Sequence, residues 1–315
     1  MLRLAALLAG LTALLVMPAT AQSPDVASLP HYPEHALETV TVDDDTLAYL
    51  DTGGDGPPLV LVHGLGSNLS LWRDHIDPLS AAHRVLALDL PGFGVSSKHG
   101  VSGRMTDFAD AVRGFVDALD LAPVTYVGVS MGGQIGLTLA LEAPAVVERL
   151  VLVSPAGIET FTDQQAAALR QTMTPQAVAS ADSSAIRQNT AVNFANWSPD
   201  YAWLIEQRHA LSKRDDFMAY ARANAAAVAG MVDEPVYDRL GEVEQPTLVL
   251  YGTGDRLIPN PYLNPQWDTA AIAQRAEEAL PNAQVHMIDA AGHLLMVEQP
   301  EAFRRHLQAF LEMQE

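Results

Sequence analysis

The feature that most constrains the fold is residues 127–133, which read VGVSMGG. An apolar run at 124–127 precedes this stretch, and a run with helical character at 134–141 follows it. We therefore predict a strand, a tight turn and a helix, with Ser130 as the serine of a G-x-S-x-G turn. Small neighbours are needed because so sharp a turn strains the serine backbone and brings strand and helix close together. The pentapeptide alone is also typical of a glycine-rich turn whose serine caps the helix.

A serine hydroxyl is a weak nucleophile unless a base removes its proton and a third group orients that base. Two further apolar runs supply candidates for these partners. Asp255 follows the run at 247–251, and His293 follows the run at 284–289. The chain order Ser130, Asp255, His293 is therefore nucleophile, acid, base, with each residue placed after a predicted strand.

Acyl transfer also requires N–H donors for the developing oxyanion. The apolar run at 58–62 ends in His63, Gly64 and Leu65, which form a loop suited to this purpose. His63 is a second candidate base, but two histidines cannot both serve one serine. We therefore expect His63, with Gly64, to support this loop by hydrogen bonding to backbone.

Taken together, these motifs resemble the α/β-hydrolase superfamily in its capped serine esterase and lipase-like branch. The resemblance covers nearly all of the chain after about residue 40, including the DLPGFG sequence at 89–94. It implies a catalytic triad of Ser130, Asp255 and His293, with the backbone N–H groups of Leu65 and Met131 as oxyanion donors. It also implies a mostly parallel eight-stranded sheet, helices on both faces and a helical cap inserted after the sixth strand, with no cofactor.

Hydrophobic patterning adds detail to this outline. Residues 39–42 and 47–50 flank three aspartates and predict an antiparallel hairpin at the sheet edge. Apolar positions between Phe108 and Leu119 follow a helical period and predict a helix laid on the sheet. Asp89 is expected to form a turn by accepting backbone N–H groups.

The pattern changes between Gly157 and about Leu240, where strand runs are missing and helix starts recur. We expect the core to comprise 38–156 and 241–315, with 157–240 as the cap. Helix-capping residues are predicted at Thr174, Ser198, Asp182 and Asp215.

Large aromatic side chains are expected mostly in the cap interior, although some should line the pocket. The aromatic residues concerned are Trp197, Tyr201, Trp203, Phe217 and Tyr220. The proline-rich stretch at 256–267 predicts either a stiff surface loop or an entrance bordered by Tyr262 or Trp267.

The start of the chain is different from the rest. Residues 1–21 combine a basic head, an apolar centre and a small-residue end, which predicts a secretory signal peptide. The apolar centre is shorter than the roughly 20 residues of a spanning helix, so no stable membrane span is expected after its removal. Residues 22–37 look like a linker, and the chain contains no cysteine for disulfides or lipid attachment. We therefore predict a periplasmic or secreted protein.

The formal net charge is −20, with 38 acidic and 18 basic residues. A field of this sign repels nucleic acids and anionic membranes, so neither is an expected partner. The acidic surface favours solubility, and adaptation to a salt-rich habitat is an alternative explanation.

The expected activity is hydrolysis of a small-molecule carboxylic ester. Dehalogenases and epoxide hydrolases of the same superfamily carry aspartate at the turn, whereas this chain has Ser130. Carbon–carbon hydrolases of ring-cleavage products share the triad and remain an alternative, although export argues against them. A non-catalytic binding module is the third possibility. The histidines show no metal-ligand spacing such as H-E-x-x-H, so no metal is expected.

Overall fold

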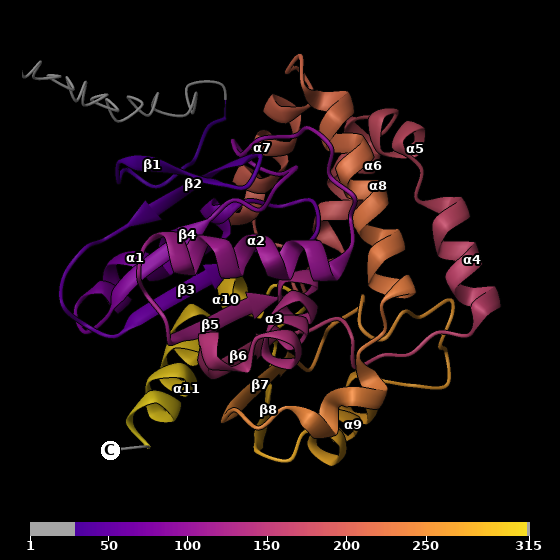
Figure 1. Ribbon diagram of the computed structural model, residues 1–315. Coiled ribbons are helices and arrows are strands. Elements are labelled where there is room, and N and C mark those ends of the chain that lie inside the picture. Colours follow the sequence, from indigo (N-terminus) through magenta and orange to yellow (C-terminus); the bar gives the residue numbers. More distant parts are fainter. Residues whose placement is uncertain (1–28, 314–315) are drawn as a thin grey trace, which may run out of the picture.

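The computed structural model describes residues 29–313. The predicted signal peptide at 1–21, and the first part of the predicted linker, lie outside the described residues. The described chain forms an eight-stranded sheet with helices on both faces, as the sequence predicts (Figure 1).

Seven strands of the sheet run parallel and β2 runs opposite to both of its neighbours. The order across the sheet is β1-β2-β4-β3-β5-β6-β7-β8. The strands are β1 (Leu37–Val42), β2 (Asp45–Asp51), β3 (Pro58–Val62), β4 (Arg84–Leu88), β5 (Val124–Val129), β6 (Val147–Val153), β7 (Thr247–Gly252) and β8 (Ala283–Ile288).

The predicted hairpin at the sheet edge is confirmed. β1 and β2 are antiparallel and are joined by two residues, with Val42 opposite Asp45. Asp43 in this turn has a positive φ of 51°. Aspartate tolerates this left-handed conformation better than most residues because its short side chain bonds locally.

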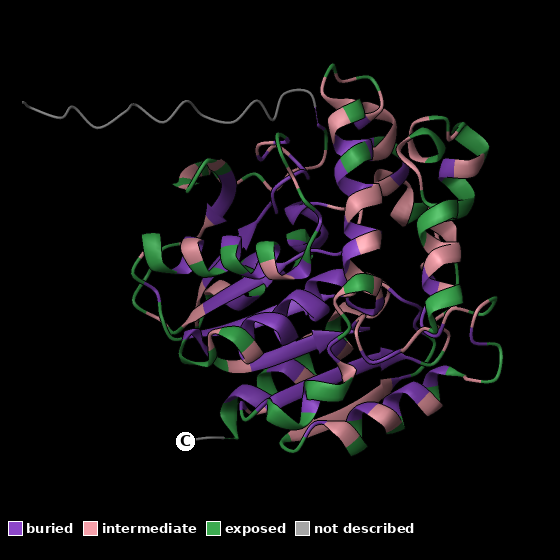
Figure 2. Cartoon of the chain, turned by 45° about the vertical axis from the view of Figure 1, so that its right-hand side comes forward, coloured by how far each residue is buried: buried purple, intermediate pink, exposed green. Residues whose placement is uncertain are grey.

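Helices cover both faces of the sheet because the central strands are apolar on both sides. In β3, Val60 and Val62 join one core, whereas Leu59 and Leu61 join the other. The first core is covered by α2 (Met105–Ala118), α3 (Met131–Glu142) and α9 (Thr269–Ala279). The second is covered by α1 (Arg73–Ser80), α10 (Leu295–Glu298) and α11 (Pro300–Glu312). Figure 2 shows the central strands buried between these two layers.

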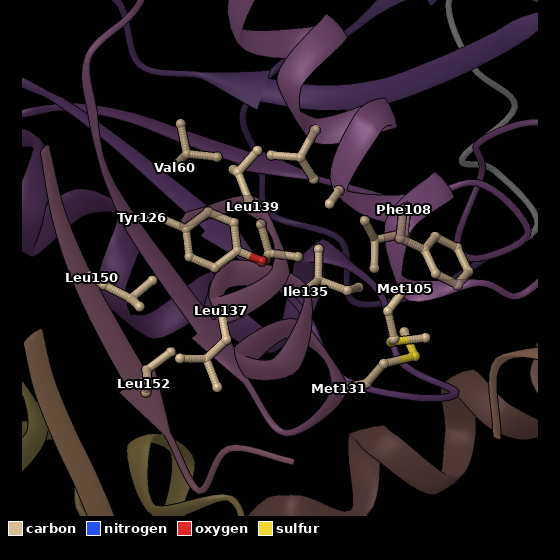
Figure 3. Close-up of a cluster of buried hydrophobic side chains, with 14 of the residues drawn as sticks. Val60, Met105, Phe108, Tyr126, Met131, Ile135, Leu137, Leu139, Leu150 and Leu152 are labelled. Carbon is tan, nitrogen blue, oxygen red and sulfur yellow. The ribbon is translucent and has the colours of Figure 1, made fainter. Parts of the chain in front are cut away.

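The first core fixes the position of α3 against β5. Tyr126 on β5 packs among apolar side chains from β5, β6 and α3, and its hydroxyl points toward α3 (Figure 3). That hydroxyl donates to the carbonyl oxygen of Gly132 at 2.6 Å. A buried hydroxyl therefore holds the first turn of α3 directly over the strand that precedes it.

Helices alone occupy the segment between β6 and β7, apart from turns and loops. We call this segment, 157–240, the cap; in Figure 1 it stands beside the sheet and rises above it. Its α-helices are α4 (Asp163–Thr172), α5 (Pro175–Ala179), α6 (Ser183–Ala191), α7 (Ala202–Leu211) and α8 (Phe217–Asp233). Short 3₁₀ helices η3 (Pro199–Tyr201) and η4 (Tyr237–Glu242) precede α7 and β7.

Three of the four predicted cap residues accept a hydrogen bond at a helix start: Thr174, Asp182 and Ser198. The prediction for Asp215 is wrong. Helix α8 has Asp216 at its N-cap position, and no side chain caps it there. The Asp216 carboxylate is instead bound by Arg214 at 2.9 Å and Lys98 at 3.4 Å.

The described part of the predicted linker packs across the molecule. Tyr32 donates to Asp89 at 2.8 Å, and His31 lies 2.6 Å from Glu206 on α7. His35 lies 2.7 Å from Asp77 on α1. Strand β1 then begins at Leu37, one residue before the core range expected from the sequence.

Within residues 29–313 no helix is both long and apolar enough to cross a bilayer. The same part of the chain contains no cluster of three or more His, Cys, Asp or Glu residues placed to hold a metal ion.

Candidate active site

The site lies where the chain order of the sheet reverses. β3 sits between β4 and β5, so the chain leaves β3 toward one side and returns to its other side. In parallel α/β sheets, ligands bind in the crevice at the carboxyl ends of the strands beside such a reversal. The candidate residues follow β3, β5, β7 and β8, whose carboxyl ends share one edge of the sheet.

Ser130 occupies the sharp turn between β5 and α3. Its backbone has φ 56° and ψ −118°, a strained conformation for a residue with a side chain. The Ser130 side chain makes no capping hydrogen bond to α3. The geometry therefore does not support the helix-cap interpretation, and the hydroxyl is left facing the cavities described below.

Gly132 brings the start of α3 against the end of β3. A Cβ atom added to Gly132 would lie 2.6 Å from the carbonyl oxygen of His63 and 2.7 Å from that of Val62. Such distances are too short for any side chain. The glycine is therefore needed to place the Met131 N–H group, at the first position of α3, beside the loop after β3.

Asp255 and His293 form a buried pair. Nδ1 of His293 lies 2.9 Å from Oδ2 of Asp255, and their side chains are 5% and 0% exposed. The other oxygen, Oδ1, accepts the N–H groups of Leu257 at 2.8 Å and Ile258 at 3.1 Å. Because an ionised carboxylate only accepts hydrogen bonds, Nδ1 carries a proton, and in the neutral form of the ring Nε2 therefore has the free lone pair.

The loops that carry Asp255 and His293 interlock. The N–H group of Gly254 donates to the carbonyl oxygen of Ala291 at 2.8 Å. A Cβ atom on Gly252 would lie 2.3 Å from the carbonyl oxygens of Ala291 and Gly292. This close backbone contact fixes the separation of the acid from the imidazole.

Two cavities meet at Ser130 and His293, which line both of them. Within residues 29–313 no hydrogen bond joins the Ser130 hydroxyl to the His293 ring. Such contacts are commonly longer before substrate binds and tighten in the reacting complex. The structure thus brings all three predicted triad residues to one site, and the serine and the histidine line the same two cavities.

His63 holds the loop after β3. Its Nδ1 lies 2.8 Å from the carbonyl oxygen of Gly64, and the Leu90 N–H group donates to Nε2 at 3.1 Å. Nε2 is therefore an acceptor and Nδ1 a donor, so the ring is neutral. Complete burial lowers the pKa of His63, which favours the same neutral form. Both ring nitrogens bind backbone, as the sequence analysis expects of a supporting residue.

This bond also orients the expected oxyanion donor. The carbonyl oxygen of Gly64 and the N–H group of Leu65 belong to one planar peptide and point in opposite directions. Because His63 holds the carbonyl, it fixes the direction of the Leu65 N–H group. Neither Leu65 nor Met131 donates its N–H group to a backbone acceptor within the described residues. Leu65 lines both cavities, and a Cβ on its neighbour Gly64 would lie 3.1 Å from Cβ of Ser130.

Asp89 has the structural role expected of it. Its buried carboxylate accepts the N–H groups of Leu69 at 2.7 Å and Val95 at 2.8 Å. It therefore ties the loop after β3 to the loop after β4.

The two cavities differ in character. The first cavity has a volume of about 570 Å³ and includes the guanidinium-bearing Arg208 and several amides. Its polar lining includes Asn189, Asn193, Arg208, Tyr220 and Asn224. The second cavity has a volume of about 550 Å³ and is mainly apolar. Its apolar lining includes Leu169, Met173, Val228, Met231, Leu257, Ile258 and Leu263.

Of the five cap aromatic residues noted in the sequence, Tyr220 lines the first cavity. Phe217 stacks on Tyr220 with ring centroids 5.8 Å apart, and Tyr201 stacks on Phe194 at 4.2 Å. Trp203 lies under the Arg73 guanidinium at 5.4 Å. The aromatic residues therefore pack chiefly within the cap and against its neighbours.

The proline-rich loop borders the second cavity. Tyr262 lines this cavity and is 91% exposed, whereas Trp267 packs against the Arg275 guanidinium at 4.6 Å. Of the two expected candidates, Tyr262 is the one at the rim of the cavity that also contains Ser130.

Two residues at the site were missed by the sequence analysis, Arg208 and Glu159. Oε1 of Glu159 accepts the N–H group of Asn260 at 2.8 Å and the Asn264 amide at 2.6 Å. Burial raises the pKa of Glu159, and repulsion by Asp255 adds to that effect. Neither residue lies in a motif, and the sequence contains no signal that marks them.

The fold and this arrangement of serine, imidazole, carboxylate and free N–H groups define a class: an open α/β sheet with a hydrolase-type nucleophile turn. A model of the alpha/beta hydrolase fold family matches residues 57–300, and the chain belongs to that family. The resemblance noted in the sequence is thereby confirmed.

Individual relatives differ in their reactions. The chain is 31% identical over 279 residues to the dihydrolipoyllysine-residue acetyltransferase component of the acetoin cleaving system of Pseudomonas putida, covering 88% of this chain and 69% of the relative. It is 29% identical to a 2-hydroxy-6-oxononadienedioate/2-hydroxy-6-oxononatrienedioate hydrolase of Cupriavidus pinatubonensis, covering 83% and 89%. Among solved structures, a bacterial membrane phospholipase A aligns with a TM-score of 0.72 at 30% identity, covering 88% and 86%.

Proposed function

We propose that this protein is a serine hydrolase that cleaves carboxylic esters of small molecules. The observation that carries the proposal is the strained Ser130 turn sharing its cavities with the buried His293–Asp255 pair. A hydroxyl, a base with a free nitrogen and an orienting carboxylate are the three groups that nucleophilic catalysis by serine requires.

In the proposed reaction, Oγ of Ser130 attacks the ester carbonyl carbon while Nε2 of His293 takes the hydroxyl proton. The N–H groups of Leu65 and Met131 hold the oxyanion, and Asp255 stabilises the imidazolium without being protonated. His293 then gives the proton to the departing alkoxide, which leaves as the alcohol. Water, deprotonated by the same nitrogen, cleaves the acyl-enzyme and releases the acid. One oxyanion donor typically lowers such a barrier by ~3 kcal/mol.

The cavities favour a substrate with one apolar side. The second cavity offers mainly aliphatic and thioether side chains beside Ser130, and burying apolar groups there is favourable. The apolar portion of the ester is therefore proposed to occupy this cavity.

Ser130→Ala tests the nucleophile assignment. The variant should fold normally and lose several orders of magnitude in kcat/KM for short p-nitrophenyl esters. A suitable control is Ser102→Ala. Ser102 lies in the loop before α2 and donates to Asp107 in the first turn of that helix, and neither residue lines the two cavities. Full activity in Ser130→Ala would reject the assignment.

Hydrolysis of a carbon–carbon bond is the second candidate reaction. It is favoured by the similarity to the Cupriavidus hydrolase. Parallel assays with esters and with a ring-cleavage-product dienone separate the two reactions, because loss of the dienone chromophore occurs only in the second. A non-catalytic binding module predicts no turnover of either and no labelling of Ser130 by a fluorophosphonate probe.

Export is a separate proposal that rests on residues 1–21. Expression of the full chain in a Gram-negative host should yield a shorter protein outside the cytoplasm. Its mass should correspond to cleavage near Ala21, and an uncleaved cytoplasmic product would contradict the proposal.

A further inference from the structure

The loop from His63 to Ser70 carries Leu65, one of the two proposed oxyanion donors, and we call it the oxyanion loop. The core holds both of its ends. His63 binds the Gly64 carbonyl oxygen at 2.8 Å, and the N–H group of Leu69 donates to Asp89 at 2.7 Å. Gly66, Asn68 and Ser70 of this loop have different partners, which come from the cap.

Tyr220 on α8 is the first of these partners. Its hydroxyl donates to the carbonyl oxygen of Gly66 at 3.0 Å, and it accepts from the amide of Asn224 at 3.4 Å. The Tyr220 side chain is fixed, because the residue is 2% exposed and packs on Phe217 and Phe93 at ring distances of 5.8 Å and 5.9 Å. A rigid cap side chain therefore binds the residue next to Leu65.

Gln207 on α7 is the second partner. Its amide nitrogen donates to Oγ of Ser70 at 2.9 Å, and its amide oxygen accepts from Asn68 at 3.3 Å. The same nitrogen donates to the carbonyl oxygen of Pro30 at 2.7 Å. Gln207 is 6% exposed, so these bonds are made away from bulk water, where an unpaired partner is costly.

The loop and α8 are also in steric contact. Gly66 has φ +71°, and a Cβ atom there would lie 3.0 Å from the Asn224 amide nitrogen and 3.1 Å from the Tyr220 hydroxyl. Helix α8 therefore packs closely on the backbone of the loop at Gly66. Movement away from it would break the bonds at Gly66 and Ser70.

We propose that Tyr220 and Gln207 are positioning residues through which the cap sets the conformation of the oxyanion loop. Both act through backbone or side-chain atoms of the loop, and they add to the bond by which His63 directs the Leu65 N–H group from the core. The cap thus contributes to transition-state stabilisation as well as enclosing the cavities. The effect on catalysis rests on the proposed function. The coupling between the cap and the conformation of the oxyanion loop does not.

The decisive variant is Tyr220→Phe, which removes one hydroxyl and keeps the packed ring. We expect kcat for p-nitrophenyl esters to fall about tenfold with KM changed less than about twofold, because slight misplacement of a catalytic group is costly. Affinity for a boronic acid, whose tetrahedral serine adduct uses the oxyanion donors, should fall in parallel. Hydrogen exchange in residues 64–70 should become faster.

Tyr49→Phe is the matched control. Tyr49 is 4% exposed and its hydroxyl donates to Glu38 at 2.9 Å, within the hairpin of β1 and β2. This variant should lose comparable stability and keep wild-type kcat, boronate affinity and exchange in the oxyanion loop. Gln207→Leu removes the second set of contacts between cap and loop, and it should have the same effects as Tyr220→Phe.

Each outcome decides one part of the proposal. Unchanged exchange in residues 64–70 of Tyr220→Phe would overturn the coupling, whatever the activity. Faster exchange with unchanged kcat would overturn its catalytic role. If wild-type protein cleaves no ester, the proposed function fails separately; the exchange measurement and the rate of fluorophosphonate labelling of Ser130 then still test the coupling.

Discussion

Nδ1 of His293 and Oδ2 of Asp255 lie 2.9 Å apart, while the second oxygen of the same carboxylate accepts two backbone N–H groups. The carboxylate is therefore held on both sides, and its orientation is set by the loop of Leu257 and Ile258. These two backbone bonds therefore also determine how the side-chain amide of an Asp255→Asn variant would be oriented.

Asp255→Asn should abolish most activity without disturbing the fold. The Leu257 and Ile258 N–H groups require an acceptor, so the amide oxygen must face them and the NH₂ group must face His293. The ring would then carry its proton on Nε2, which could no longer accept one from Ser130. We expect kcat to fall ~10⁴-fold, as measured for this substitution in a serine protease triad.

Asp268→Asn is the control for that variant. Asp268 caps α9 by accepting from Ala271 at 2.8 Å, and asparagine caps helices equally well. Activity and melting temperature should remain near the wild-type values. Retained activity in Asp255→Asn, with an unchanged fold by circular dichroism, would contradict the role of Asp255.

Gly132→Ala should damage the site by a purely steric route. Its Cβ would meet the carbonyl oxygens of His63 and Val62, both of which belong to a central strand and its adjoining loop. Because backbone cannot yield easily, the start of α3 must shift and carry the Met131 N–H group with it. We expect kcat to fall ~10²-fold, since displacement by about 1 Å has that order of effect.

Gly241→Ala separates this effect from the general cost of replacing a glycine. A Cβ atom there meets nothing within 4 Å, so the substitution should be neutral or slightly stabilising. Equal losses of kcat in the two variants would show that steric contact at Gly132 is not the cause.

The sequence predicted the sheet and the position of the candidate residues after their strands, because each of these residues follows an apolar strand run and a glycine-containing turn. Such features are local and depend on backbone geometry that few residue types permit. Ser130, Asp255 and His293 could therefore be placed at strand ends without knowledge of contacts. Because β5, β6, β7 and β8 run parallel, these ends lie at one edge of the sheet.

The contacts of the cap could not be predicted in the same way. The bonds of Tyr220 to Gly66 and of Gln207 to Ser70 join residues more than 130 positions apart, and no local pattern encodes them. Asp215 was a wrong prediction for a similar reason. Its neighbour Asp216 occupies the cap position, where Arg214 and the distant Lys98 bind its carboxylate.

Because of the buried His75, we expect the free energy of unfolding to decrease in acid. Burial lowers the pKa of His75 to about 4 from its ordinary value of 6.5, and the ring bonds the Met296 carbonyl oxygen at 2.9 Å. The unfolded chain binds the proton more readily, so stability is fully present above pH 6.5 and is lost as pH falls toward 4. The loss should approach about 3 kcal/mol, at up to ~1.4 kcal/mol per pH unit.

His75→Phe tests this assignment by urea unfolding between pH 7 and pH 4. Phenylalanine fits the aromatic surroundings of Trp72 and Phe303 but cannot titrate. The variant should be less stable at pH 7, because the Met296 carbonyl loses its donor, yet its stability should fall less steeply on acidification. An identical slope in both proteins would assign the acid sensitivity to other groups.

For Glu159 we expect the free energy of unfolding to depend on pH in the opposite direction. Burial and the Asp255 charge raise the pKa of Glu159 above its ordinary value of 4.5. The folded state therefore keeps a proton that the unfolded state releases, so stability decreases as pH rises from 4.5 through the raised folded pKa. In Glu159→Gln this decrease is absent. The amide oxygen can still accept from Asn260 and Asn264, because both bonds go to one oxygen of the carboxylate.

The measurement is the difference in free energy of unfolding between Glu159→Gln and wild type at pH 4, 6 and 8. This difference should grow in favour of the variant with rising pH, because only the wild type must ionise a buried carboxyl or retain its proton. Glu148→Gln, at an exposed position on β6, should show no such trend. A constant difference across this range would mean that Glu159 titrates alike in both states. The loop of Asn260 and Asn264 that borders the second cavity would then be held by a carboxylate that is charged at neutral pH.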